Sequence, residues 1–154
     1  MTITDRRTTP NLGQPLPLAE AAPPACSFVR TYSLDTVTVV ELRGTLDLAT
    51  ASHVRAHLDA AAAPQGARVV VDMRPVEFFD CTTLGLLCRT RRRARASDGL
   101  LVVVCARPWH LRIHTAAGLH RLLRPVATLE AALTQASQWQ RPTTPRPSAL
   151  SQDW

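Results

Sequence analysis

Two short runs of apolar residues constrain the fold of this chain more than any other feature of its sequence. Segments 68–72 (RVVVD) and 100–105 (LLVVVC) each contain a continuous apolar run that is rich in valine. A strand with this pattern is typically buried on both faces, as in a parallel sheet covered by helices. Between them, residues 82–96 carry leucines on one side and arginines on the other, which predicts a helix. We therefore expect two buried parallel strands joined by that helix.

The region before these strands predicts a hairpin and a further helix. Segments 28–32 and 36–42 are rich in β-branched residues and flank a turn at Asp35-Thr36, so they are expected to pair as antiparallel strands. Gly44 is expected to end the second strand. Residues 47–63 predict a helix with apolar residues at helical spacing, capped by Asp47 or Thr50. Its apolar face is expected to contain Leu48, Ala51, Val54 and Leu58, and its stop signals are Pro64 and Gly66.

The order of elements places the chain in the α/β class. The remaining segments predict a connection over 73–77, a helix over 108–117, a short extended segment over 122–126 and a helix over 128–138 capped by Thr128. Strands that alternate with helices form mostly parallel sheets, and the first hairpin adds an antiparallel edge. We expect a mixed, mostly parallel sheet of about four to five strands, flanked by about four helices.

Composition sets the expected domain boundaries. Segments 1–26 and 139–154 lack periodicity; the first is rich in proline, threonine and alanine, and the second in proline. Such segments cannot bury enough apolar surface to order themselves. We expect a flexible N-terminal tail over 1–26, a single domain over 27–138, and a flexible Pro-rich C-terminal tail over 139–154.

Charge and cysteine content limit the environment and the partners of the chain. The net charge is +6, and all 18 basic residues are arginine. A positive surface can attract nucleic acid, anionic lipid or an acidic protein surface, although a genome-wide bias towards arginine would leave the same composition. The 4 cysteines form no C-x-x-C pair, so we expect reduced thiols, a cytoplasmic location, and no metal or cofactor. No signal peptide or membrane-spanning segment is expected.

Three pieces of the sequence carry a resemblance to a known family. The first is LRGTLD at 42–47, and the second is VVVD at 69–72 followed by VEFFDCTTLG at 76–85. The third is the arginine-rich segment 91–96 with the elements that follow it: Gly99 and a valine-rich strand, AGL at 117–119, and LEAAL at 129–133. In order and spacing these pieces resemble the STAS domain of bacterial anti-sigma factor antagonists, over most of residues 28–135.

The resemblance implies a switch based on protein binding. In the family, an unphosphorylated antagonist binds an anti-sigma factor, which then releases its sigma factor. The anti-sigma factor is often also an ATP-dependent Ser/Thr kinase, and it breaks the complex by phosphorylating the second hydroxyl residue of an Asp-Ser-Ser-Gly motif. The matching positions here are Asp80, Cys81, Thr82 and Thr83, so Thr82 is the implied phosphorylation site and Thr83 the less favoured one. Three of these four positions depart from the motif, and Thr45 replaces a Glu.

The position of this segment at the start of a helix fits a phosphorylated site. The first turn of a helix has free backbone N–H groups and the positive end of the helix dipole, both of which favour a phosphate. Simple helix capping is the competing interpretation of Thr82 and Thr83. The expected partner-binding residues are Asp47, Asp80, Cys81, Thr82, Thr83, Leu84 and Arg89.

Catalysis and nucleic-acid binding are the competing functions. Asp47 and Asp80 could form an acid–base pair, but the chain has no Gly-rich phosphate loop and no nucleophile–His pair, so no enzyme is expected. Residues 89–95 contain 5 arginines that could bind phosphates; a solvated helix face, or a basic rim that steers an acidic anti-sigma factor, is preferred. The runner-up function is a STAS subunit, without phosphorylation, of a larger stress-signalling or lipid-transport assembly. An arginine-driven nucleic-acid binder ranks third.

Several single residues have a functional and a structural interpretation. Cys81 could be a redox-sensitive thiol, but a small buried residue is preferred because it follows two phenylalanines. Trp109, near the start of a helix, is expected to be partly buried. The i, i+4 spacing that can hold a metal ion occurs in two pairs that are expected to be solvated surface residues: His53 with His57, and His110 with His114.

Overall fold

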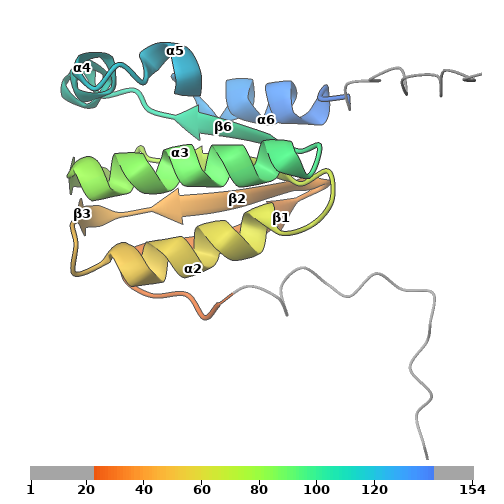
Figure 1. Cartoon of the computed structure of the whole chain (residues 1–154), viewed down its shortest axis with the longest axis horizontal. Helices are drawn as coiled ribbons and strands as arrows, with labels where there is room; N and C mark the ends of the chain where they lie inside the picture. Colours follow the sequence, from red (N-terminus) through yellow and green to blue (C-terminus); the bar gives the residue numbers. More distant parts are fainter. Residues whose placement is uncertain (1–22, 141–154) are drawn as a thin grey trace, which may run out of the picture.

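The computed structural model describes residues 23–140, and its centre is a four-stranded sheet (Figure 1). The strands lie in the order β1 (Val29–Leu34), β2 (Val37–Leu42), β4 (Arg68–Asp72) and β6 (Leu100–Val104). β1 and β2 form the expected antiparallel hairpin, whereas β2, β4 and β6 run parallel to one another. The expectation of an α/β fold with a mixed, mostly parallel sheet is confirmed.

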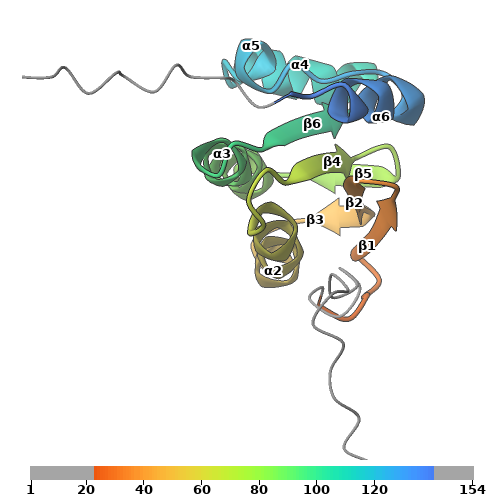
Figure 2. The same ribbon diagram turned by 90° about the vertical axis from the view of Figure 1, so that its right-hand side faces the viewer.

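Helices cover both faces of this sheet (Figure 2). α2 (Ala51–Ala62) and α3 (Cys81–Ala96) pack on one face, and α6 (Leu129–Ser137) packs on the other. α4 (Pro108–Ala116) and the short α5 (His120–Leu123) lie near the β6 edge. Within α6 the expected cap is present, because the hydroxyl of Thr128 accepts a hydrogen bond from the N–H of Ala131 at 3.1 Å.

Alternate residues of the central strands point into two hydrophobic clusters, which explains their continuously apolar sequences. Val69 and Val71 of β4 belong to the larger cluster, which also contains leucines of α2 and α3. Val70 belongs to the smaller cluster, which contains alanines of α6. In β6, Val103 and Val102 are divided between the two clusters in the same way. Burial on both faces explains why Val69–Val71 of β4 and all of β6 carry no polar side chain.

Two strands were not expected from the sequence. β3 (Gly44–Leu46) and β5 (Val76–Phe79) form a separate parallel pair. β2 ends at Leu42, before the expected stop at Gly44, and Gly44 is instead the first residue of β3. Its φ of 69° is a conformation that glycine adopts readily. The segment 73–77 is therefore only partly a connection. Strands this short, one of them directly after Pro75, leave too few residues for an alternating pattern to be recognised.

Two further boundaries differ from the expectation. The segment 122–126 is not a simple extended stretch: α5 occupies its first half, and only Val126 pairs, through a single parallel bridge to Val104. The helix expected from residue 47 begins at Ala51, because the side chain of Asp47 holds a turn before it. As a result Leu48 is not part of the apolar face of α2 and is 77% exposed.

The expected tails are described only at their inner ends. The N–H of Cys26 donates to the carbonyl of Val29 at 3.1 Å, and the carbonyl of Trp139 accepts from Arg68 at 3.0 Å. The rest of both tails, 1–22 and 141–154, lies outside the described residues. Over residues 23–140, no helix is both long and apolar enough to cross a membrane.

Candidate functional site

The pairing of β3 with β5 brings Asp47 and Asp80 to the same end of the molecule. Leu46 is the register partner of Phe79, and the N–H of Asp80 donates to the carbonyl of Leu46 at 3.2 Å. Asp47 and Asp80 are the next residues along each strand, so they follow the carboxyl ends of two neighbouring parallel strands.

Both carboxylates bind backbone N–H groups. Oδ1 of Asp80 accepts from Thr82 at 3.0 Å and from Thr83 at 3.4 Å, which makes Asp80 the N-cap of α3. Oδ1 of Asp47 accepts from Ala49 at 2.9 Å and from Thr50 at 3.2 Å. The α3 cap is therefore Asp80 and neither threonine, which leaves the hydroxyls of Thr82 and Thr83 without a capping role. An acid–base role has little support here, because both carboxylates are used as hydrogen-bond acceptors.

The residues after Asp80 differ sharply in accessibility. Thr82 is half-buried, whereas Thr83 and Leu84 are each only 4% exposed and Leu84 is part of the larger hydrophobic cluster. Cys81 is exposed, so the expectation of a buried residue is wrong. Phe79 is the buried member of the aromatic pair and Asp80 occupies the cap, which places Cys81 at the outer start of the helix. Among the two threonines, Thr82 is the one that a partner can reach.

Three large apolar side chains around this segment are exposed. Leu48 directly follows Asp47. The side chain of Phe78 is 51% exposed, and Phe78 is the register partner of Thr45 in the pairing of β3 with β5. Trp109, the second residue of α4, is 65% exposed. Trp109 precedes His110, whose Nε2 lies 3.2 Å from the carbonyl of Glu77 in β5. Exposed apolar groups gathered beside polar ones mark interaction sites. We call the following residues the docking surface: Asp47, Leu48, Phe78, Asp80, Cys81, Thr82 and Trp109.

For one of these apolar residues, Phe78, the sequence itself indicates exposure. Adjacent residues of a strand point to opposite faces, so Phe78 and Phe79 could not both enter one core. Leu48 and Trp109 had no such signal. Leu48 was expected on the apolar face of the helix because of its helical spacing. Trp109 was expected to be partly buried, but it is far more exposed than that.

The buried histidines correct another expectation. His57, His110 and His114 are buried, and only His53 of the two pairs is exposed. The rings of His110 and His114 lie 4.9 and 5.7 Å from that of Phe79, directly behind the docking surface. Burial lowers the pKa of His114, and the neighbouring His110 lowers it further. Among residues 23–140, no group of three His, Cys, Asp or Glu side chains could hold a metal ion.

Arg89 takes part in the packing of α3 against α2. Its guanidinium pairs with Asp59 of α2, which also forms ion pairs with Arg93 at 3.0 Å and with Arg55 at 3.6 Å. Arg89 lies about two helical turns from Thr82, and its guanidinium is already engaged with this carboxylate. A contact with a partner is therefore better supported for the docking surface than for Arg89.

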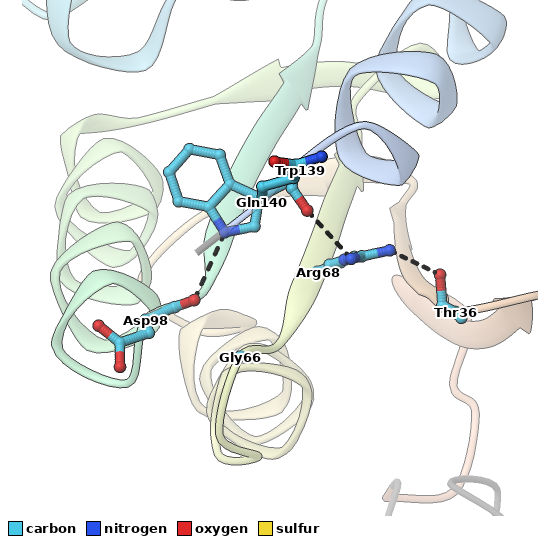
Figure 3. Close-up of a pocket in the computed structure, with 6 residues that line it drawn as sticks. All are labelled: Thr36, Gly66, Arg68, Asp98, Trp139 and Gln140. Atoms are coloured by element: carbon cyan, nitrogen blue, oxygen red, sulfur yellow. Dashed lines mark hydrogen bonds between the residues drawn. The ribbon is translucent and has the colours of Figure 1, made fainter. Parts of the chain in front are cut away.

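A polar pocket of about 480 Å3 lies at the opposite end of the sheet, near the start of β4 (Figure 3). Arg68 crosses it and donates to the hydroxyl of Thr36 at 3.1 Å and to the carbonyl of Trp139 at 3.0 Å. The indole N–H of Trp139 donates to the carbonyl of Asp98 at 3.4 Å. These hydrogen bonds hold the end of α6 against the sheet. The polar groups of this pocket therefore have a structural role.

The comparisons with known proteins agree with this architecture. Residues 18–125 match a family model described as "Mlab, STAS domain". An anti-sigma factor antagonist from Mycobacterium paratuberculosis is 27% identical, with a TM-score of 0.65 over 71% of this chain and 92% of that one. A putative anti-sigma factor antagonist from Thermotoga maritima is 17% identical, with a TM-score of 0.64 over 71% and 95%.

A third solved structure shares the fold. The Bacillus cell fate determinant SpoIIAA in its phosphorylated form is 23% identical, with a TM-score of 0.55 over 70% of this chain and 97% of that one. A search of curated protein sequences finds no match. The family model covers well over half of the chain and agrees with the observed fold, and the resemblance noted in the sequence is confirmed: the chain belongs to the STAS domain family.

Proposed function

We propose that this chain is an anti-sigma factor antagonist, which acts by binding an anti-sigma factor through the docking surface so that a sigma factor is released. The observation that carries the proposal is that the half-buried Thr82 follows the capping Asp80 at the start of α3, near the exposed apolar side chains of Leu48, Phe78 and Trp109. The apolar rim supplies the area that a protein partner can bury. The similarity to solved structures of anti-sigma factor antagonists supports the same reading.

We further propose that the partner is a Ser/Thr kinase that phosphorylates Thr82. The kinase would transfer the γ-phosphoryl group of ATP to Oγ1 of Thr82, with release of ADP and of the hydroxyl proton. Thr82 is favoured over Thr83 because the side chain of Thr83 is almost fully buried. The phosphate would add about −1.5 to −2 charges at a helix start that already holds Asp80. The first turn of α3 tolerates this charge, whereas an apolar or acidic partner surface does not.

Mass spectrometry after incubation with the kinase and ATP tests the modification. The expected result is one added phosphate on the wild-type chain and on Thr83→Ala, and none on Thr82→Ala. A phosphate that persists in Thr82→Ala and disappears in Thr83→Ala would show that the site has been assigned to the wrong residue.

Co-purification with the anti-sigma factor tests the binding. Thr82→Glu is expected to weaken the complex, because it places a negative charge on the docking surface. Thr134→Glu is the matched control, since Thr134 is exposed on α6, across the sheet from α3. Equal binding by both variants would exclude the switch, and a wild-type chain that captures no anti-sigma factor would exclude the proposed function.

A STAS subunit of a larger stress-signalling or lipid-transport assembly is the second candidate. The exposed apolar side chains of Leu48, Phe78 and Trp109 favour it, because permanent interfaces are more apolar than transient ones. Trp109→Ala would then weaken the assembly, whereas Thr82→Glu would have a much smaller effect. The ratio of these two effects separates the static subunit from the switch.

A further inference from the structure

A second pocket, of about 360 Å3, is lined by four arginines and lies away from the docking surface. Arg91 and Arg95 come from the second half of α3, Arg121 comes from α5, and Arg124 is the C-cap of α5. At a rise of about 1.5 Å per residue, Arg91 and Arg95 lie roughly 14 and 20 Å along α3 from Thr82. A ligand in this pocket would therefore not compete directly for the docking surface.

The four arginines have no counter-charge within the described part of the chain. None of them forms an ion pair with a carboxylate of residues 23–140, whereas Arg89 on the same helix pairs with Asp59. Like charges at i and i+4 of a helix, such as Arg91 and Arg95, destabilise it. The pKa of Arg91 is lowered first by burial and then by the charges of its neighbours, including Arg95. An anion in the pocket would relieve this repulsion.

The backbone of Arg124 has an unusual conformation. Its φ of 42° lies in the left-handed region, which favours glycine or asparagine over other residues. The turn is held by a hydrogen bond from the N–H of Arg124 to the carbonyl of His120 at 2.9 Å. A helix C-cap alone would be served better by glycine, so the turn by itself gives no reason for an arginine.

The pocket also contains apolar surface and a backbone donor. The side chains of Leu101 and Leu123 are almost fully buried and line it. The N–H of Leu100 donates to Ala67 beside β4, and the carbonyl of Val103 accepts from Val126 on the other edge of β6. Because backbone groups alternate along a strand, Leu101 directs its N–H and carbonyl to the edge away from β4, where the pocket lies.

We propose that this pocket binds a phosphate ester with a small apolar or aromatic body. Guanidinium groups recognise phosphate through paired, charge-assisted hydrogen bonds, and several of them around one cavity fit a doubly charged group. The leucines would contact the apolar body. The volume lies within the roughly 300–1,000 Å3 of small-molecule sites. The proposal does not depend on the proposed function, because it involves none of the residues of the docking surface.

Calorimetry with the full chain and 1-naphthyl phosphate, in a phosphate-free buffer of low ionic strength, tests the proposal. We expect one site, and a loss of affinity of about tenfold or more in Arg91→Gln and in Arg124→Gln, as for the loss of a charge-assisted hydrogen bond. Arg92→Gln is the control with the same change of charge: Arg92 is exposed on α3 and does not line the pocket. Its affinity is expected to stay within about twofold of wild type.

The control variant and three further ligands test the separate parts of the proposal. Equal losses in Arg91→Gln and Arg92→Gln would overturn it, because only the net charge would then matter. Neutral 1-naphthol binding as tightly as its phosphate would overturn the role of the arginines, and inorganic pyrophosphate binding more tightly would overturn the role of the apolar body. Binding to vesicles that contain phosphatidic acid, lost in Arg91→Gln and absent for pure phosphatidylcholine, would support the same chemistry with a lipid as its source.

Discussion

Replacement of Asp80 tests the role of this residue as the N-cap of α3. Oδ1 of Asp80 accepts two backbone N–H groups at the start of α3, and α3 has no acidic residue in its first turn. Loss of an N-cap side chain costs about 1 kcal/mol, and loss of a negative charge at a helix start costs about 0.5 kcal/mol. We expect Asp80→Ala to lower the free energy of unfolding by about 1.5 kcal/mol.

Asparagine gives the sharper comparison, because it caps helices about as well as aspartate. Asp80→Asn should lose only the charge term, about 0.5 kcal/mol, as measured by urea unfolding followed by circular dichroism. Thr128→Ala is the control: it removes the cap of α6, should cost about 1 kcal/mol, and should leave partner binding unchanged. If Asp80→Asn were as unstable as Asp80→Ala, or if Asp80→Ala were as stable as wild type, the assignment of Asp80 as the cap would be refuted.

Three further measurements follow from burial. Burial lowers the pKa of His114 below its ordinary value of about 6.5, so the unfolded chain binds more protons than the folded chain at lower pH. The free energy of unfolding should therefore fall as the pH drops below about 6.5, measured by urea midpoints from pH 8 to pH 5. Leu87→Ala, at a fully buried site, should cost about 2–5 kcal/mol, against well under 1 kcal/mol for the partly exposed Leu34→Ala. In the folded chain an alkylating reagent should modify the exposed Cys81 well before Cys105, whose pKa is raised by burial; the order is read by peptide mass spectrometry and would be contradicted by equal rates.

The sequence predicts the elements whose environment is uniform along their length. The middle of β4 and the whole of β6 are apolar because both faces are covered, and α3, which lies between them in the chain, is long enough for its two sides to differ clearly. These elements lead directly to the mostly parallel sheet. Capping of α3 was expected of Thr82 or Thr83, and the structure instead uses Asp80, another residue type that is favoured before a helix.

The sequence fails where the environment of a residue is decided by distant parts of the chain. His110 and His114 read as polar residues on a helix surface, yet α4 packs so that both rings meet Phe79 of β5. No pattern within α4 indicates this, because its apolar Trp109 is exposed while its histidines are buried. The short β3 and β5 could not be recognised for the same reason: each is stabilised mainly by the other, and together they position Asp47 beside Asp80.

The arginines of α3 form one run in the sequence, but in the structure their side chains lie on different sides of the helix. Residues four apart share a face of a helix, and each step of two residues turns by about 200°. Arg89 and Arg93 therefore face α2 and share Asp59, while Arg91 and Arg95 face the other way and line the pocket beside β6. The helix that presents Thr82 at its first turn thus uses Arg89 and Arg93 for its own packing and leaves Arg91 and Arg95 for the proposed anion.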